Sequence, residues 1–495
     1  MSSESEKSLL KTIERKIPNI GVSNKVEELN NYKTYNPLID VTVPPIAIAK
    51  PADVEQLRKL IIAANEEGFC VVPVSSGAPH LKGGIKCSMP HILVDLSAWK
   101  RIPMIDRRNR VCMVEPGVTY GELLYALEPY GMTIPMPLAP RSTKSVLSAV
   151  LDREPSTLPN KQWDISDPLG STEFIFGNGD VFRTGAGGGP GSLEKQRAVG
   201  GTQKSPMGPS QTDFHRVLQG AQGSMGIVTW ATLRTELKPS IQDPLVACDD
   251  ELEKIISFVY EVQRSWLGEH SFILDRNALA MLMTHESPND FASLRESVKK
   301  FVCIQNIAGF ERLPKERVEY QKADITETAQ KNRIELGKTC GELPAEILLK
   351  KATTPCGNRN WRHSLKGHCL TIFFLSTLDK APKFITSFEK LADKHTVIFG
   401  TYIQPVVQNH ACHIEFMVPF NPMNKSEVSQ MKKLEEEAVN ELSTEGAFFS
   451  RPYGGAERLP FRKNPLYAEL LKKIKGIFDP NGVLNPDKFC FSDEV

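Results

Sequence analysis

The sequence predicts an α+β protein with more than one domain. The chain has 495 residues, which is too long for one hydrophobic core and suits two or three domains. Runs of β-branched and aromatic residues alternate with segments whose apolar residues recur at helical spacing, and the connections between them are short. From about residue 240 helical segments again alternate with strand-like runs in a different pattern, which indicates a second α+β domain.

Composition excludes several classes of protein. The formal net charge is +1 and the pI is near 7.6, so the basic surface expected of a nucleic-acid-binding protein is missing. The sequence contains no apolar run of about 18 residues, which predicts no membrane span. The first 20 residues are polar and lack the apolar core of a signal peptide, so we expect a cytoplasmic protein.

Cysteine usage agrees with that compartment. The ten cysteines are dispersed and form no CxxC pair, which disfavours zinc ribbons and cysteine-ligated iron–sulfur clusters. Reduced, mostly buried thiols are the simplest expectation.

The first domain begins with a helix, a strand and an unusual loop. Apolar residues at helical spacing predict a helix over 51–68 that Gly68 ends, and "FCVVPV" predicts a strand over 69–74. The bend that follows, "SSGAPHLKGG", is rich in glycine and contains a proline without an amide donor. Successive N–H groups in such a bend can bind an anion, phosphate above all, although an ordinary surface loop has the same composition.

A helix and a hairpin are predicted further along this domain. Strands are expected over 91–96 and 110–117, and the capping-box spacing of Thr119 and Glu122 predicts a helix over 119–131. The pair Asn178–Gly179 lies between two apolar runs and predicts a hairpin over 174–185.

Residues 183–213 are rich in Gly, Ser, Pro and Gln, which predicts a long loop or flap. The "GAGGG" within it is not a dinucleotide fingerprint, because Pro190 follows and no helix begins there.

The second half alternates long helices with strands. Two helices are expected over 250–266 and 426–442, and a third begins the tail at 466–489 and ends in an Asp-Pro-Asn-Gly turn. Strand patterns occupy 368–376, 395–407 and 410–420.

Four motifs in a fixed order identify the family that this sequence resembles. They are "PVSSGAPHLKGG" (73–84), "VEPGVTYGELLYAL" (114–127), "GAQGSMGIVT" (220–229) and "DPNGVLNPDK" (479–488). Together they resemble the flavoproteins of the vanillyl-alcohol oxidase / p-cresol methylhydroxylase family, over about 40–240 and again over 445–490. The resemblance implies a PCMH-type FAD-binding domain in two parts and an α+β cap domain that binds the substrate.

The resemblance also implies domain boundaries. These are an N-terminal extension (1–40), the FAD-binding domain (41–240), the cap domain (241–444) and a C-terminal segment that returns to the FAD-binding domain (445–495).

The resemblance implies that FAD is held mainly by backbone groups of glycine-rich loops. Two phosphates need several convergent N–H donors and no bulky side chains, and glycines let the backbone approach the flavin closely. The residues implied are Ser75, Ser76, Gly77, Ala78, Pro79, His80, Pro116, Gly117, Ser142, Thr143, Ser145, Asp152, Gly220, Gly223, Gly226, Ile227 and Val228.

The sequence departs from the family between residues 140 and 152. Relatives carry adjacent glycines in this second loop, whereas this chain has Leu147 and Ser148 there. Leu151–Asp152 still matches a family step, and the nearby hydroxyl groups can donate hydrogen bonds. The departure leaves the position of the dimethylbenzene edge of the flavin open.

Arg451 is the first candidate for a catalytic residue. The family places an arginine over the active site in the segment "SRPYGGAERLPF", where it can stabilise a reduced flavin or an anionic substrate. Phenol-oxidising relatives have a tyrosine just before this arginine, but this chain has Ser450, and Tyr453 is the residue that can replace that tyrosine.

The strand segment "QNHACHIEF" carries further candidates. His413 and Glu415 share one strand face, and His410 precedes them. His413 can act as a base or contact the substrate, His410, His413 and Glu415 can bind a divalent metal, or the histidines can be structural. The wider, glycine-containing spacing of metal-binding relatives is missing, so we expect no metal.

The predicted function is that of an FAD-dependent oxidoreductase that moves a hydride from a small organic substrate to flavin N5. A phenolic or benzylic alcohol is the favoured substrate, a lactate- or glycolate-like 2-hydroxy acid is the alternative, and a flavoprotein fold that has lost catalysis is a further one. We expect non-covalent FAD, because His80 and His368 do not fall where covalent relatives place their anchor and Thr371 lies nearer to it. The resemblance further implies a homodimer and, as electron acceptor, oxygen or an electron-transfer protein.

Overall fold

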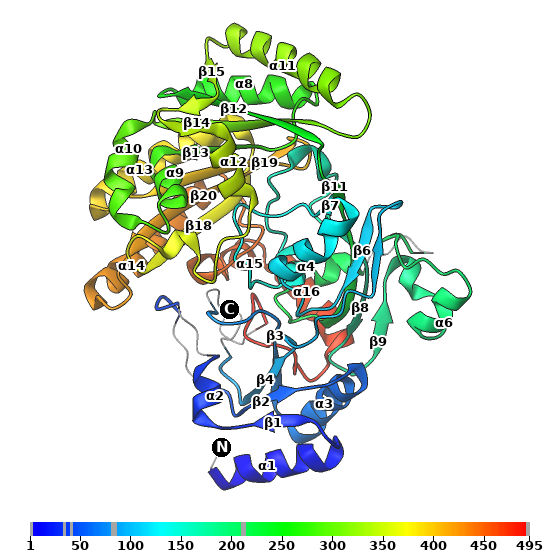
Figure 1. Ribbon diagram of the computed structural model, residues 1–495. Coiled ribbons are helices and arrows are strands. Elements are labelled where there is room, and N and C mark those ends of the chain that lie inside the picture. The colour runs from blue at the N-terminus through cyan, green and yellow to red at the C-terminus, as the bar shows by residue number, and fades with distance from the viewer. Residues whose placement is uncertain (1–2, 33–35, 40–42, 81–86, 209–213, 492–495) are drawn as a thin grey trace.

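The computed structural model describes residues 3–32, 36–39, 43–80, 87–208 and 214–491. Most of its strands form two sheets in the N-terminal half and one larger sheet in the second half, which lies apart from them in the upper part of Figure 1. Two further pairs of short strands form two-stranded sheets of their own. The predicted α+β class is therefore confirmed.

The first sheet has four strands, which are β1 (Gly21–Ser23), β2 (Ala47–Lys50), β3 (Cys70–Val74) and β4 (His91–Asp95). Both β2 and β3 run parallel to the central β4, and β1 pairs with β2 in the antiparallel sense. Apolar residues of two helices, α1 (Ser3–Lys16) and α3 (Val54–Glu67), share a core with the sheet. Asp53 caps the start of α3. Gly68 ends the helix in a left-handed conformation, and this end is the one that the sequence predicts.

The second sheet has five antiparallel strands in the order β5-β6-β10-β8-β9. Their bounds are Met104–Asp106 (β5), Val111–Val114 (β6), Leu169–Ile175 (β8), Val181–Arg183 (β9) and Ile227–Arg234 (β10). The hairpin that Asn178–Gly179 predicts is confirmed, because β8 pairs with β9 and Gly179 has a φ of 87°. The capping box of Thr119 and Glu122 is also present, at the start of α4 (Tyr120–Leu127).

The described part of the predicted long loop, residues 183–208, is more ordered than expected. It contains α6 (Leu193–Ala198), which Ser192 caps, and a buried Gln196 whose amide donates to Gly187 O. A polar side chain that satisfies backbone carbonyls gives a glycine-rich segment a fixed path, which composition alone does not reveal.

The third sheet has seven strands, all antiparallel, in the order β15-β12-β14-β13-β19-β20-β18. Their bounds are Ile241–Asp249 (β12), Ser271–Asp275 (β13), Phe301–Gly309 (β14), Glu335–Gly337 (β15), His368–Ser376 (β18), Gly400–Val406 (β19) and Ala411–Phe420 (β20). The predicted strand over 395–407 begins late, because the preceding helix continues to His395 and ends at Thr396 with a φ of 52°.

Helices cover both faces of this sheet (Figure 1). One core includes residues of α8 (Leu252–Arg264), α11 (Pro314–Lys331), α13 (Ala381–His395) and α14 (Lys425–Thr444). The other includes residues of α9 (Arg276–Met283), α10 (Phe291–Ser297) and α12 (Ala345–Thr353).

Short elements connect these layers. They are α2 (Val26–Asn30), α5 (Val146–Leu151), α7 (His215–Leu218), α15 (Leu459–Lys463), β7 (Met132–Thr133), β11 (Glu236–Leu237), β16 (Thr339–Cys340) and β17 (Leu343–Pro344).

The C-terminal segment runs back to the first sheet (Figure 1). After α16 (Pro465–Phe478), Leu484 forms a bridge with Val71, and Val71 N donates to Val483 O. Strand β3 is therefore flanked by the C-terminal end of the chain, directly before the predicted phosphate loop.

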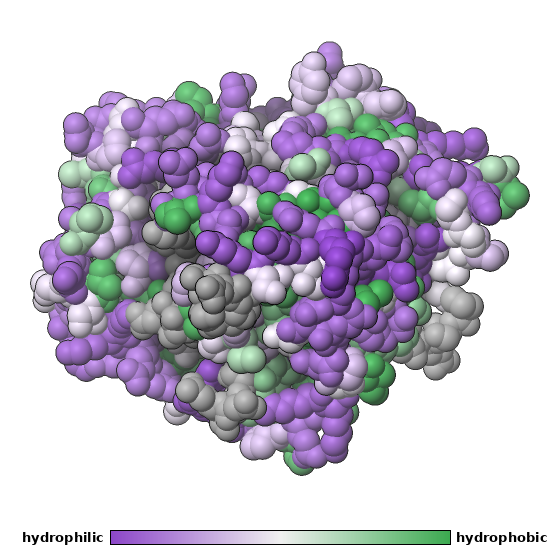
Figure 2. All heavy atoms as spheres, turned by 90° about the horizontal axis from the view of Figure 1, so that it is seen from below, coloured by the Kyte–Doolittle hydropathy of each residue, from purple (hydrophilic) through white to green (hydrophobic). Residues whose placement is uncertain are grey.

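The surface around the N-terminal sheet is mostly polar. Figure 2 shows this face as hydrophilic over most of its described area, with hydrophobic residues in small, separate groups. Among the described helices, none has the length and apolar character that crossing a membrane requires.

Candidate active site

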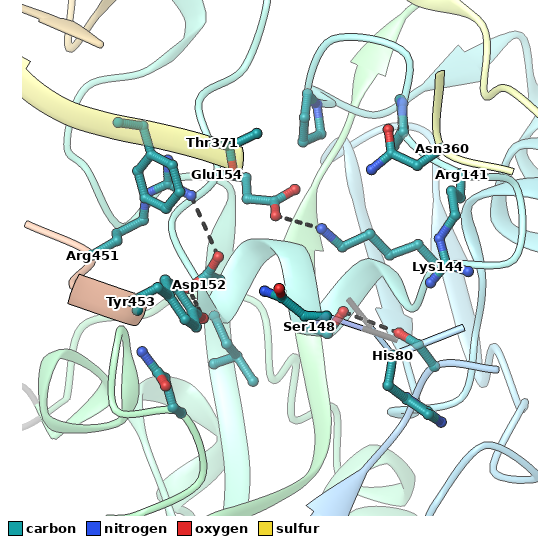
Figure 3. A pocket seen from close by; sticks show the side chains of 18 of the residues that line it. His80, Arg141, Lys144, Ser148, Asp152, Glu154, Asn360, Thr371, Arg451 and Tyr453 are labelled. Carbon is teal, nitrogen blue, oxygen red and sulfur yellow. Dashed lines mark hydrogen bonds and ion pairs between the residues drawn. The ribbon is translucent and has the colours of Figure 1, made fainter. Parts of the chain in front are cut away.

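A cavity of about 440 Å³ lies where the N-terminal sheets meet the seven-stranded sheet. Its walls come from the loop after β3, the segment around α5, the start of β10, strand β18 and the segment 449–456. In Figure 3, Arg451, Tyr453 and Asp152 lie at one side of it and His80 and Arg141 at the other, with Lys144, Glu154 and Ser148 between them.

The structure brings most of the predicted residues to this cavity. The residues that line it are Ser75, Ser76, Pro79, His80, Pro116, Asp152, Gly223, Gly226, Ile227, Val228, Arg451 and Tyr453. Gly77 and Ala78 line a smaller neighbouring hollow that also includes Ser76 and His80.

The other predicted residues stand behind the wall or in the connecting turns. They are Gly117, Ser142, Thr143, Ser145, Gly220 and His413. The end of the predicted loop, residues 81–84, lies outside the described residues.

Hydrogen bonds join the two predicted loops. Ser145 N donates to Ser76 Oγ at 3.0 Å, and Ser145 Oγ donates to Pro116 O at 2.6 Å. Ser145 also caps α5 by accepting from Ser148 N. Ser145 therefore fixes the wall of the cavity without lining it, which the sequence did not reveal.

The bend after β3 has the composition and geometry of an anion site. In the part of the chain that the structure describes, no acceptor bonds the backbone N–H groups of Ser75, Ser76, Gly77 and Ala78. A Cβ on Gly77 would have nothing within 4 Å, so there is open space beside this backbone. Such a group of donors suits a diphosphate.

The glycines of "GAQGSMG" are required by contacts within the protein itself. A Cβ on Gly223, which has a φ of 77°, would lie 2.6 Å from Pro73 Cγ. A Cβ on Gly220 would lie 2.6 Å from Arg153 Nη2, and one on Gly226 would lie 2.9 Å from Leu218 and Phe174. The turn needs glycine because other protein atoms occupy the space beside it.

Asp152 joins the two candidate catalytic side chains at one end of the cavity (Figure 3). Tyr453 Oη donates to Asp152 Oδ1 at 2.6 Å, and Arg451 Nη1 lies 3.4 Å from Asp152 Oδ2. The Arg451 guanidinium lies over the Phe373 ring, 4.4 Å from its centroid. Burial and the Asp152 carboxylate raise the pKa of Tyr453 well above its ordinary value, so this phenol keeps its proton.

Neighbouring loops hold this segment in place. Arg153 Nη2 donates to Ser450 O at 2.6 Å, and Gln222 Nε2 donates to Pro452 O at 3.1 Å. Arg451 and Tyr453 are therefore supported by contacts on either side.

A buried ion pair, Arg362 with Glu415, forms part of the cap-domain wall. Arg362 donates to both carboxylate oxygens, at 2.5 and 3.1 Å, and its guanidinium lies over the Trp361 ring. Burial alone would raise the pKa of Glu415, but the Arg362 guanidinium outweighs it and lowers the pKa to about 2.

His413 lies one layer behind this pair. Its Nε2 is 3.4 Å from Glu415 Oε2, and its ring packs beside Phe373 and Tyr402. Burial lowers the pKa of His413 to about 4, so it is neutral at pH 7. This placement fits a residue that supports Glu415 rather than a base in contact with substrate.

His410 lies on an exposed turn, and among the described residues no group of three His, Cys, Asp or Glu side chains could hold a metal ion.

Besides Glu435, sequence reasoning missed four charged residues that line the cavity, namely Arg141, Lys144, Glu154 and Arg362. Lys144 Nζ lies 2.5 Å from Glu154 Oε1, directly across the cavity wall. Arg141, Lys144 and Glu154 lie in or next to the segment 140–152, where the family's glycines are replaced. Their charge was the only signal in the sequence that could have indicated a role in the cavity. Arg362 lies in a segment without any periodic pattern.

Comparison with known proteins agrees with this architecture. Residues 45–185 match the model of the FAD binding domain, and residues 374–489 match that of the FAD linked oxidases, C-terminal domain. The glycolate oxidase subunit GlcD of Bacillus subtilis is 22% identical over 91% of this chain and 90% of its own. A D-2-hydroxyglutarate dehydrogenase of Stutzerimonas stutzeri is 20% identical over 90% of each chain.

Solved structures share the whole fold. A 4-ethylphenol oxidase from Gulosibacter chungangensis, in complex with isoeugenol, superposes with a TM-score of 0.84 at 16% identity and covers 100% of this chain and 98% of its own. A p-cresol methylhydroxylase with bound substrate gives 0.80 at 18% identity, covering 99% and 97%.

Fold and matched domains define this protein as an FAD-dependent oxidoreductase. The chain belongs to the FAD-linked oxidases with the PCMH-type fold, as the motifs predicted. The cavity fits the cofactor, because open backbone donors at one end suit its diphosphate and a buried guanidinium at the other suits a reduced flavin.

Proposed function

We propose that this chain oxidises a phenolic or benzylic alcohol-type compound. When bound, FAD supplies the redox chemistry by accepting a hydride at flavin N5. The observation that carries the proposal is the meeting of the Arg451 guanidinium and the Tyr453 hydroxyl at Asp152, inside an aromatic wall.

The hydrogen-bond directions give each side chain a role. Tyr453 donates its only hydroxyl proton to Asp152 Oδ1, so towards a substrate hydroxyl its oxygen can act only as an acceptor. A proton leaving the substrate oxygen can pass to Tyr453 Oη as the Tyr453 proton moves to Asp152. The Arg451 guanidinium donates to the oxyanion that remains.

The shape of this end favours an aromatic substrate. Its wall includes the rings of Phe373, Tyr402, Phe449 and Tyr453. A phenolic ring can stack against these side chains, as aromatic pairs do, while its oxygen reaches Arg451. Tyr453 lines the cavity and so can take the place of the tyrosine that Ser450 replaces.

A 2-hydroxy acid is the second candidate. Relatives named glycolate oxidase, D-lactate dehydrogenase and D-2-hydroxyglutarate dehydrogenase match this sequence, two of them over about 90% of its length. Arg451 can also hold a carboxylate. Arg458 is the other arginine of the segment "SRPYGGAERLPF", and it does not line the cavity.

An anaerobic substrate screen tests the proposal. The purified yellow protein is mixed with 4-alkylphenols, benzylic alcohols, lactate and glycolate, and bleaching of the visible flavin band is followed. We expect bleaching by the aromatic compounds. Bleaching by the hydroxy acids alone would establish the second candidate, and no bleaching by any of them would contradict both.

The remaining expectations belong to the same proposal. Non-covalent FAD is supported by Thr371, which lines the cavity but whose side chain does not form flavin linkages. Acid precipitation should therefore release the yellow colour into the supernatant.

The compartment, the oligomeric state and the electron acceptor are further parts of the proposal. The ten cysteines are all free, which suits the cytoplasm. A homodimer, and oxygen or an electron-transfer protein as acceptor, are proposed from the family resemblance.

A further inference from the structure

Four basic residues line the cavity, and three of them face a carboxylate. Lys144 faces Glu154 at 2.5 Å, Arg362 faces Glu415 at 2.5 Å, and Arg451 faces Asp152 at 3.4 Å. Each of these pairs carries about zero net charge.

Arg141 is the exception. Its side chain is 7% exposed, and its Nη1 is buried without a hydrogen-bond partner. Within the described residues no carboxylate lies within 4 Å of it. A desolvated, unpaired guanidinium is costly, so it indicates a place that an anion fills.

The position of Arg141 indicates which anion this is. In Figure 3 it lies on the side of His80, away from Arg451. His80 lies two residues after Ala78, the last of the four residues whose backbone N–H groups have no acceptor among the described residues. This end of the cavity therefore combines open amide donors with an unpaired positive charge.

The backbone explains why this chain needs such a charge. Relatives have adjacent glycines in the second loop, whereas here Leu147 and Ser148 lie in the first turn of α5, and both line the cavity. Side chains at these positions keep the backbone of this loop further from a ligand. A guanidinium offers two parallel donors to a phosphate and can supply the contact that the glycines no longer give.

We propose that Arg141 binds the diphosphate of FAD and replaces the contact of the missing glycine-rich second loop. The proposal rests on the FAD-dependent function above. Its test measures binding without any substrate, so it can fail while the substrate screen succeeds, and the reverse.

The test compares two ligands that differ in the diphosphate. Apoprotein is titrated with FAD and with riboflavin, which has the same ring system and no phosphate, and the quenching of flavin fluorescence is followed. Arg141→Met should weaken FAD binding about 10- to 100-fold, as expected for a charged hydrogen-bonding partner, and leave riboflavin binding unchanged. Arg141→Lys, which keeps the charge without the fork, should fall between Arg141→Met and the unsubstituted protein.

Arg101→Met is the matched control, because Arg101 pairs with Glu115 and its side chain is 83% exposed. It should bind both ligands like the unsubstituted protein. If Arg141→Met does not fold, as judged by circular dichroism, Arg141→Gln takes its place in the series. Unchanged FAD affinity, an equal loss for riboflavin, or an effect only on the KM of an anionic substrate would each overturn the proposal.

Discussion

Arg451 shows how one buried side chain can be held charged and still available. Its guanidinium is sandwiched between the Phe373 ring, 4.4 Å away, and the Asp152 carboxylate, 3.4 Å away. The 3.4 Å between Arg451 Nη1 and Asp152 Oδ2 is long for an ion pair, so donors of the guanidinium remain available for a second partner. The ring restricts its rotation, so the side chain is positioned before substrate arrives.

Arg451→Ala should lower the rate of flavin reduction by substrate about 10²- to 10³-fold, the usual effect of removing a donor to a developing oxyanion. FAD should remain bound, because the proposed diphosphate site lies at the other end of the cavity. Stopped-flow absorbance under anaerobic conditions gives the rate, and the absorbance ratio of flavin to protein gives the occupancy. Arg462→Ala, an exposed arginine of the neighbouring α15, is the control. Equal reduction rates in both variants would remove Arg451 from the site.

At the scale of elements, the turn 220–226 connects three parts of the chain. Gly223 packs on Pro73 of β3, and Asn485 Nδ2 from the C-terminal segment donates to Gln222 O at 2.7 Å. The turn leads directly into β10, whose first residues, Ile227 and Val228, line the cavity. Its conformation therefore determines where these backbone groups lie.

Gly223→Val should lower both the melting temperature and the retention of FAD. The φ of 77° and the 2.6 Å approach to Pro73 exclude a β-branched side chain, so the turn must move. Thermal unfolding and the flavin-to-protein absorbance ratio after gel filtration measure the two effects. Gly476→Ala on α16, where a Cβ meets nothing within 4 Å, is the control and should be neutral or slightly stabilising. Full FAD occupancy and an unchanged melting temperature for Gly223→Val would contradict this account.

The tail is joined to the turn by a buried ion pair on α16. Lys475 Nζ lies 2.6 Å from Asp479 Oδ2 and donates to Ser224 O and Leu484 O. Asp479 in turn accepts from Val483 N and Leu484 N. The Asp-Pro-Asn-Gly motif is thus a structural connection, because both carboxylate oxygens of Asp479 have partners.

Lys475→Met should reduce the free energy of unfolding by about 3–5 kcal/mol, because it leaves the Asp479 carboxylate buried without its cation. Lys473→Met on the same helix removes an exposed pair of the same spacing, Lys473 with Glu469, and should cost about 0.5 kcal/mol or less. Urea unfolding of both variants measures the difference. Similar losses in the two would show that burial of the pair is not what matters.

At the scale of the whole molecule, the cavity exists because three sheets meet. The two N-terminal sheets supply the end proposed to bind phosphate, and strands β18 to β20 supply the opposite wall. Domain boundaries at 40, 240 and 444 remain our proposal, and the one at 240 is supported by the change of sheet between β10 and β12. Histidines are buried around this cavity, so we expect the free energy of unfolding to depend on pH.

The free energy of unfolding should fall as the pH is lowered from about 6.5 towards 4. Burial lowers the pKa values of His270 and His413 to about 4, and His80, His363 and His368 shift in the same direction. Between these values and the ordinary 6.5 the unfolded chain binds more protons than the folded one. The stabilisation is therefore complete above pH 6.5 and is lost as the pH falls through the folded-state values.

Urea unfolding at several pH values and one saturating FAD concentration measures this slope. His413→Gln removes one of the buried imidazoles and should flatten the slope by up to one proton. A slope that is equally steep in the variant would mean that His413 does not contribute.

Sequence by itself determined the local structure and the family. Helix caps at Thr119 and Gly68, the Asn178–Gly179 hairpin and strand β18 were predictable, because each depends on residues that are neighbours along the chain. Only the tertiary structure decided which charges meet. Asp152 and Arg451 are 299 positions apart, and the unpaired state of Arg141 depends on every element that surrounds it. Contacts of that kind follow from how the sheets pack, which no local pattern encodes.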